Sequence, residues 1–116
     1  MIFSSALKLN HIFRRLYATP GHANGCLVLY ARKNRTPYNR VGITVSKKLG
    51  HAVVRNRVRR QLREIYRCNE SAFQPGWDIV VVARSRAVHV PFSQLSQSYL
   101  SLAQKAGILV PEERDT

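Results

Sequence analysis

Apolar residues follow two periods along this chain, and the change from one period to the other falls near its centre. Val41, Ile43 and Val45 alternate with small or polar residues, which predicts a half-buried strand over 41–46. Gly50 then marks a turn. Beyond it, apolar residues recur at intervals of four, four and three, as one stripe of a helix does: Val54, Val58, Leu62 and Ile65. The centre of the chain therefore predicts a strand followed by an amphipathic helix.

Shorter patterns predict the elements of the N-terminal part. Asn10 suits the N-cap of a short helix, which ends at 19–21 because Pro and Gly do not continue it. A strand is expected over 26–32, with a weaker strand over 22–24 beside it. The polar and basic segment 33–40 reads as a hairpin loop.

The C-terminal part predicts a strand and a second helix. The most apolar run spans 77–84 and predicts an interior strand covered on both faces. An amphipathic helix follows Pro91 and ends near Gly107, and the tail 110–116 is expected to be frayed. The order α-β-β-β-α-β-α predicts a single α+β domain over 1–116, a sandwich of helices on one small sheet. Its strand, helix and strand in succession predict a crossover between parallel strands.

The charge of the chain points to a polyanionic partner. Nineteen Lys and Arg against six Asp and Glu give a net charge of +13, which indicates nucleic acid first and an anionic membrane surface second. The charge is concentrated in 47–67, where Glu64 is the single acidic residue. Arg55, Arg59 and Arg63 are like charges four residues apart, which costs helix stability. The arrangement therefore favours a polyanion-binding face over an ordinary solvated one.

Other functional classes have little support in the sequence. No apolar run approaches the length of a membrane span, and the N-terminus lacks the features of a signal peptide. Cys26 and Cys68 have no metal-type spacing and are expected to be reduced thiols. The acidic residues within the expected fold, Glu64, Glu70 and Asp78, show no spacing that would coordinate a metal. We therefore expect a binding protein without catalytic residues or a metal site of its own, in the cytoplasm.

The run 41–60 closely resembles the signature of the bacterial ribonuclease P protein family, with Arg55-Asn56-Arg57 matching the centre of its arginine-rich motif. The resemblance covers nearly the whole chain. It implies a ribosomal protein S5 domain 2-like fold, with a four-stranded mixed sheet and a left-handed β-α-β crossover, against the usual right-handed rule.

The resemblance also implies a function. Family members assist a catalytic RNA, which works with Mg²⁺, in the endonucleolytic removal of 5′ leaders from precursor tRNA. The protein binds the leader and lowers the Mg²⁺ requirement, while the RNA carries out catalysis. The implied partners are the ribonuclease P RNA and the precursor-tRNA leader, with no membrane and no obligate protein partner.

Two sets of site residues follow from the resemblance and the charge pattern. The set expected to contact the catalytic RNA is Lys47, Lys48, Arg55, Asn56, Arg57, Arg59, Arg60, Arg63 and Arg67. Phe13, Tyr17 and Tyr30 match the aromatic lining of the family's leader-binding cleft, which lies between the first helix and the sheet. By helical spacing alone, Phe13 and Tyr17 would instead be core residues.

The sequence departs from the family pattern at three positions, and two other functions are still possible from the sequence. His51 stands where an Asn could cap the central helix, and Ala6 and Gly25 stand at positions that are often basic. The charge fits a structural RNA-binding protein, such as a small ribosomal protein, equally well. A protein-only nuclease is disfavoured by the scarcity of carboxylates.

Overall fold

A computed structural model describes residues 4–6 and 10–111, and for 4–6 and 10–13 it describes the backbone alone. In that part of the chain the strands are β1 (Ser4–Ala6), β2 (His22–Ala23), β3 (Leu27–Lys33), β4 (Asn39–Thr44) and β5 (Trp77–Ala83). The helices are α1 (Asn10–Tyr17), α2 (Ala52–Asn69) and α3 (Phe92–Lys105). Three short 3₁₀ helices connect them: η1 (Lys47–Leu49), η2 (Glu70–Ala72) and η3 (Ser85–Val88).

The described strands form one mixed sheet in the order β1-β4-β5-β3-β2. β5 lies at its centre, parallel to β4 and antiparallel to β3. This confirms the predicted α+β fold, the interior position of 77–84 and the crossover between parallel strands, which α2 makes. β1 is an edge strand, parallel to β4, that the sequence analysis did not predict. Its residues, Ser-Ser-Ala, are too few and too polar to show a strand period.

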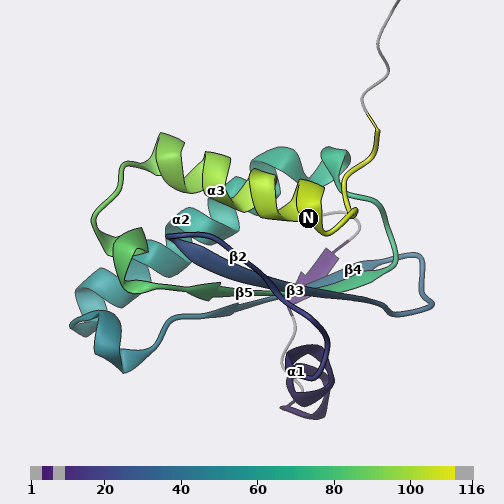
Figure 1. The fold of residues 1–116 in the computed structure, drawn as a ribbon, viewed down its shortest axis with the longest axis horizontal. Helices are drawn as coiled ribbons and strands as arrows, with labels where there is room; N and C mark the ends of the chain where they lie inside the picture. The colour runs from purple at the N-terminus through teal and green to yellow at the C-terminus, as the bar shows by residue number, and fades with distance from the viewer. Residues whose placement is uncertain (1–3, 7–9, 112–116) are drawn as a thin grey trace, which may run out of the picture.

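The helices lie on both faces of the sheet. Figure 1 shows α2 and α3 together on one face and α1 alone on the other. Side chains alternate between the faces along β5, so Ile79 and Val81 join the larger core with α2 and α3, while Val80 packs with Leu16 of α1. All four of these side chains are fully buried.

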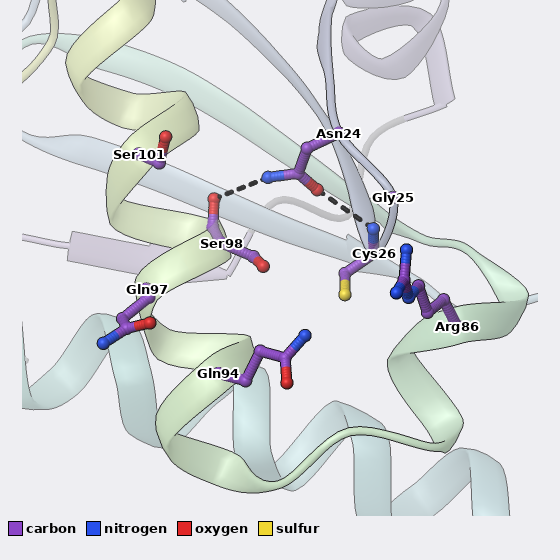
Figure 2. Close-up of a pocket in the computed structure, with 8 residues that line it drawn as sticks. All are labelled: Asn24, Gly25, Cys26, Arg86, Gln94, Gln97, Ser98 and Ser101. Carbon is purple, nitrogen blue, oxygen red and sulfur yellow. Dashed lines mark hydrogen bonds between the residues drawn. The ribbon is translucent and has the colours of Figure 1, made fainter.

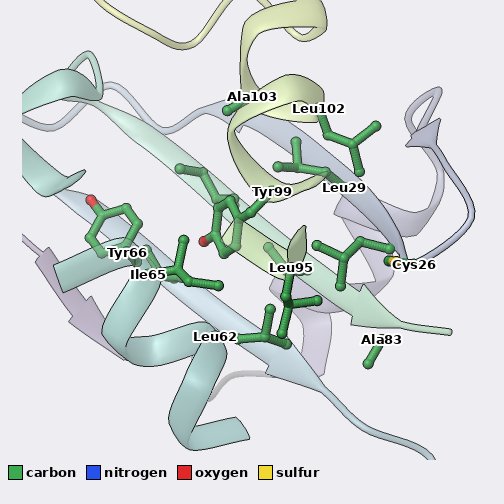
Figure 3. Packing of buried hydrophobic residues seen from close by; sticks show 14 of the residues in the cluster. Cys26, Leu29, Leu62, Ile65, Tyr66, Ala83, Leu95, Tyr99, Leu102 and Ala103 are labelled. Carbon is green, nitrogen blue, oxygen red and sulfur yellow. The ribbon is translucent and has the colours of Figure 1, made fainter. Parts of the chain in front are cut away.

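Three of the four residues of the predicted apolar stripe of α2 lie in the larger core, whereas Val54 is half-buried. Val58, Leu62 and Ile65 are fully buried, and Tyr66 extends the buried face at the C-terminal end of the helix. Figure 3 shows Leu62, Ile65 and Tyr66 beside Leu95 and Tyr99 of α3. The hydroxyl of Tyr99 is buried without a hydrogen-bond partner among the described residues, and burial raises its pKa above the usual range.

A buried asparagine joins the start of the sheet to the end of α2. The side-chain amide of Asn39 donates to the Tyr66 hydroxyl (3.1 Å) and to the Gln74 carbonyl (3.0 Å). Its oxygen accepts a hydrogen bond of 2.8 Å from the Trp77 backbone N–H. Asn39 of β4 therefore satisfies donors and acceptors from α2, β5 and the connection between them.

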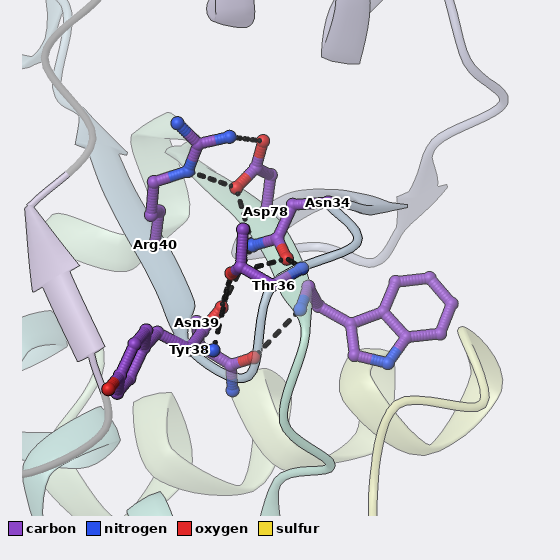
Figure 4. Close-up of polar contacts among 7 residues, drawn as sticks. Asn34, Thr36, Tyr38, Asn39, Arg40 and Asp78 are labelled. Carbon is purple, nitrogen blue, oxygen red and sulfur yellow. Dashed lines mark hydrogen bonds and ion pairs between the residues drawn. The ribbon is translucent and has the colours of Figure 1, made fainter.

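A second polar group fixes the hairpin between β3 and β4. The buried carboxylate of Asp78 accepts from Nε and Nη2 of Arg40, both at 2.7 Å, and from the Asn34 amide at 3.0 Å. Figure 4 shows this ion pair beside the hairpin. The bidentate geometry locks Arg40 against the sheet face that carries α1.

The C-terminal segment is held to the core beyond α3. The backbone N–H of Val110 donates to the Ala72 carbonyl (2.7 Å), and Leu109 forms a β-bridge with Phe73. Ordered packing thus reaches the first residue of the tail expected to be frayed, and 112–116 lie outside the described residues. No helix within the described ranges is both long and apolar enough to cross a membrane.

Candidate nucleic-acid interface

The basic surface is built on η1 and on the outer side of α2. Gly50 separates the two elements with φ 141°, a backbone conformation that favours glycine. His51 occupies the N-cap of α2, and within the described part of the chain its side chain makes no capping hydrogen bond. The helix N-terminus is held instead by Arg55, whose Nε donates to the Gly50 carbonyl at 3.2 Å.

The structure places all nine predicted RNA-contacting residues on η1 and α2. Seven of them are exposed: Lys47, Lys48, Asn56, Arg57, Arg60, Arg63 and Arg67. Arg55 and Arg59 are half-buried. All nine lie away from the buried stripe of Val58, Leu62 and Ile65, because that stripe faces the sheet.

Three arginines of this surface are held in place by hydrogen bonds within the protein. Besides the bond of Arg55 to Gly50, Nη2 of Arg57 donates to the Val88 carbonyl at 2.9 Å. Nη1 of Arg59 donates to Oδ1 of Asn56 at 2.9 Å. Each guanidinium keeps further N–H groups for a ligand, and its restricted motion lowers the entropic cost of binding a phosphate.

Arg67 differs from the other arginines because it is paired with an acid. Its Nε donates to Oε2 of Glu64 at 2.9 Å, and its Nη2 bonds the second carboxylate oxygen. Hydrogen bonds from Arg67 first, and from the Cys68 thiol second, lower the pKa of Glu64 to about 2. Glu64 therefore stays ionised above that pH and offsets the charge of Arg67. The i,i+3 spacing of the two residues was the sequence signal for this pair.

Two of the predicted aromatic residues meet on the opposite face of the sheet. The ring of Tyr17, at the end of α1, contacts the ring of Tyr30 on β3 edge-on, with centroids 5.2 Å apart at 87°. The Tyr17 hydroxyl lies 3.2 Å from Oγ1 of Thr44 on β4. Gly21 allows this arrangement, because a Cβ there would lie 2.7 Å from the Tyr30 ring.

The exposure of Tyr17 corrects the interpretation from helical spacing alone. Tyr17 is 44% exposed, so it is not a core residue, and Leu16 is the residue of α1 that is fully buried. A two-turn helix lying on a sheet buries a narrow stripe, and Tyr17 lies beside it. Phe13 belongs to α1, but its side chain lies outside the described residues, as does that of Ala6 in β1.

The described carboxylates of Asp78 and Glu64 are each engaged by an arginine. Within residues 4–6 and 10–111, no group of three or more His, Cys, Asp and Glu could hold a metal ion. The chemistry presented by the described residues is positive charge and amide groups on the basic surface, and aromatic rings on the opposite face of the sheet.

A basic helix with a single acidic residue on a small α+β fold, with an aromatic pair on the other side of the sheet, defines a small RNA-binding protein. The family model for Ribonuclease P matches residues 3–107. The chain belongs to the ribonuclease P protein family.

Known relatives agree with this assignment over most of their length. The ribonuclease P protein component of Clostridioides difficile is 40% identical over 92% of this chain and 96% of its own. A solved structure of the Staphylococcus aureus RNase P protein superposes with a TM-score of 0.83 at 34% identity, covering 90% of this chain and 97% of that one. The RNase P protein from Thermotoga maritima superposes with a TM-score of 0.79 at 32% identity, covering 86% and 96%.

Proposed function

We propose that this chain is the protein subunit of ribonuclease P and that it assists a catalytic RNA in removing 5′ leaders from precursor tRNA. The observation that carries the proposal is the basic surface of η1 and α2. Arg55, Arg57 and Arg59 are pre-positioned there, and Arg60 and Arg63 make no hydrogen bond or ion pair with other described residues. Phosphates of the RNA subunit are the ligands that such a surface binds.

The aromatic pair on the other face suits a single-stranded segment of the substrate. Tyr17 and Tyr30 lie on the face that also carries Arg40, held there by Asp78. Unpaired bases stack on exposed aromatic rings. We assign the 5′ leader to this face, with Phe13 on the same helix as the third predicted aromatic contact.

Mg²⁺ belongs to the RNA subunit in this proposal. A protein that contributes positive charge beside the catalytic RNA and holds the leader reduces the need for free Mg²⁺ to screen phosphate repulsion. No residue of the protein is assigned to metal binding or to catalysis.

The test is cleavage of a precursor tRNA with a 5′ leader at low Mg²⁺ by the protein alone, by a bacterial ribonuclease P RNA alone, and by both together. We expect cleavage in the mixture only, because in this proposal the RNA carries catalysis and needs more Mg²⁺ when it acts without the protein. The protein-alone arm is essential, since one solved relative is a Staphylococcus aureus RNase P protein mutant with defective mRNA degradation activity.

Each of the other outcomes would indicate a different function for the protein. Cleavage by the protein alone would assign catalysis to its own side chains and overturn the proposal. Binding of the RNA without any stimulation of cleavage would identify a structural RNA-binding protein. Mature tRNA is the substrate control, because it retains the tRNA body but has no 5′ leader and therefore lacks the bond to be cut.

A further inference from the structure

A polar pocket lies between α3, η3 and the turn that joins β2 to β3, away from the aromatic pair. Its volume is about 300 Å³. It is lined by Asn24, Gly25, Cys26, Arg86, Gln94, Gln97, Ser98 and Ser101. Figure 2 shows the side chains of Gln94 and Ser98 on α3 facing Cys26 and Arg86 across the pocket. Its size lies at the lower end of that of small-ligand sites.

Hydrogen bonds fix the walls of the pocket relative to one another. Oδ1 of Asn24 accepts from the backbone N–H groups of Cys26 and Leu27, both at 3.0 Å, which sets the turn between β2 and β3. The amide of the same residue donates to the Ser98 carbonyl at 3.1 Å, which ties that turn to α3. The pocket is therefore held open by a rigid polar frame.

The charge inside the pocket is positive and is not neutralised by the described residues. The exposed Arg86 side chain lies against Gly25, where a Cβ would come within 3.1 Å of its Nη1. Within the described ranges, the Arg86 guanidinium makes no ion pair and no hydrogen bond, whereas the neighbouring Arg84 donates to the Asn24 carbonyl at 2.8 Å. The sequence of α3, which forms the opposite wall, contains no Asp or Glu. An anionic ligand therefore meets no acidic residue on either wall.

The remaining polar groups are those that recognise a nucleobase. Gln94 and Gln97 each carry an amide with donor and acceptor groups, and the hydroxyls of Ser98 and Ser101 can serve as either. Such groups bind the edges of unpaired bases and the ribose hydroxyl, while arginine binds the phosphate.

The pocket is also physically connected to the basic surface. η3, which carries Arg86, packs against both η1 and α2. The hydrogen bond from Arg57 of α2 to the Val88 carbonyl joins the basic surface directly to η3. An RNA strand that crosses the basic surface can therefore continue over η3 into the pocket.

We propose that this pocket binds one unpaired nucleotide of RNA, with its phosphate on Arg86 and its base against Gln94 and Gln97. The inference rests on the proposed function only in that a ribonuclease P RNA, alone or with precursor tRNA, supplies the strand. It adds a contact site on the sheet face opposite the aromatic pair.

Matched charge variants test the phosphate contact in the assembled particle. Arg86→Gln should weaken binding of the ribonuclease P RNA by roughly threefold to tenfold. It should also reduce the salt slope of binding by about 0.7. Lys105→Gln removes the same charge from the exposed C-terminal end of α3, outside the pocket, and should have a smaller effect on both. Arg86→Lys should restore the salt slope because it keeps the charge.

Photocrosslinking tests the location of the nucleotide. A benzophenone amino acid at Gln97 should crosslink to a discrete RNA nucleotide in the particle, and Arg86→Gln should reduce the yield of that crosslink. The same probe at Gln104, an exposed residue of α3 that does not line the pocket, is the control. Equal crosslinking from 97 and 104, or none from 97, would overturn the inference, as would identical RNA affinities for Arg86→Gln and Lys105→Gln. Cleavage at low Mg²⁺ in the same samples separates this failure from failure of the proposed function, which would leave the unsubstituted protein without stimulation.

Discussion

The side chain of Tyr17 is partly packed against the sheet and partly exposed to solvent. One edge of its ring contacts Tyr30, its hydroxyl lies beside Thr44, and 44% of the residue is open to solvent. A ring that is fixed on two sides and open on a third loses little entropy when a base stacks on it. This is the residue-scale basis of the leader site.

We expect Tyr17→Ala to lower the affinity of the holoenzyme for precursor tRNA while its affinity for mature tRNA stays the same. Loss of one stacked base costs about 1–3 kcal/mol, or roughly fivefold to 150-fold in the dissociation constant. Tyr17→Phe keeps the ring and should retain most of the affinity. The measurement is equilibrium binding of precursor and mature tRNA to each holoenzyme.

Tyr38→Ala is the matched control for this prediction. Tyr38 is also an exposed tyrosine (53%), but it lies in the hairpin between β3 and β4. An equal loss of affinity for precursor and mature tRNA in Tyr17→Ala would show that Tyr17 supports the fold or the tRNA body site and does not stack on the leader.

At the scale of the element, α2 shows how tertiary packing supports a helix that its own charges destabilise. Arg55, Arg59 and Arg63 are like charges at i,i+4 spacing, and their repulsion opposes helix formation. The burial of Val58, Leu62 and Ile65 against the sheet stabilises the same helix by several kcal/mol in total, at about 1.5–3 kcal/mol for each fully buried side chain. Packing outweighs repulsion, so the charged side can be selected for binding.

The ion pair of Glu64 with Arg67 gives a test at this scale. Because the pKa of Glu64 is lowered to about 2, its negative charge is present at every assay pH above that value and is lost only below it. Glu64→Gln should therefore release Arg67 for a phosphate and strengthen RNA binding. The salt slope should become steeper by about 0.7–0.9.

A double-mutant cycle separates this effect from a change of net charge. Glu64→Gln combined with Arg67→Gln restores the net charge of the unsubstituted protein and removes the released cation. The double variant should bind RNA no more tightly than the unsubstituted protein. If it keeps the tighter binding of Glu64→Gln, the gain comes from the lost negative charge alone and Arg67 is not a contact.

At the scale of the whole molecule, the sequence predicted the features that local periodicity encodes. α2 and β5 are long and regular, so their type and their burial could be predicted. β1 could not, because three small residues show no period and their strand geometry comes from pairing with β4. The exposure of Tyr17 could not be predicted from helical spacing, since it depends on how α1 lies on the sheet; only the family resemblance placed Tyr17 in a cleft. The pocket around Arg86 was also missed, because the fold brings together segments that are separate in the sequence.

The net charge of +13 affects the stability of the free protein as well as its binding. Like charges repel more strongly in the compact state than in the unfolded chain, and salt screens them as the Debye length falls from about 30 Å at 0.01 M to about 10 Å at 0.1 M. The like-charged pairs of α2 alone contribute about 1 kcal/mol of repulsion. We expect the Tm of the protein without RNA to rise by about 4 °C or more between 0.01 and 0.2 M KCl.

Salt should have opposite effects on the Tm of the free protein and on its affinity for RNA. If about five phosphates are neutralised, the affinity for the RNA subunit should fall about 10²–10³-fold between 0.05 and 0.2 M salt. Potassium phosphate at equal ionic strength is the control. Phosphate binds the folded basic surface and should raise the Tm further than KCl does. A Tm that is unchanged or lower in KCl would show that the basic residues do not repel one another enough to matter in the folded protein. Their clustering on α2 would then carry no cost in stability, and an ordinary solvated helix face would account for it as well as a binding surface does.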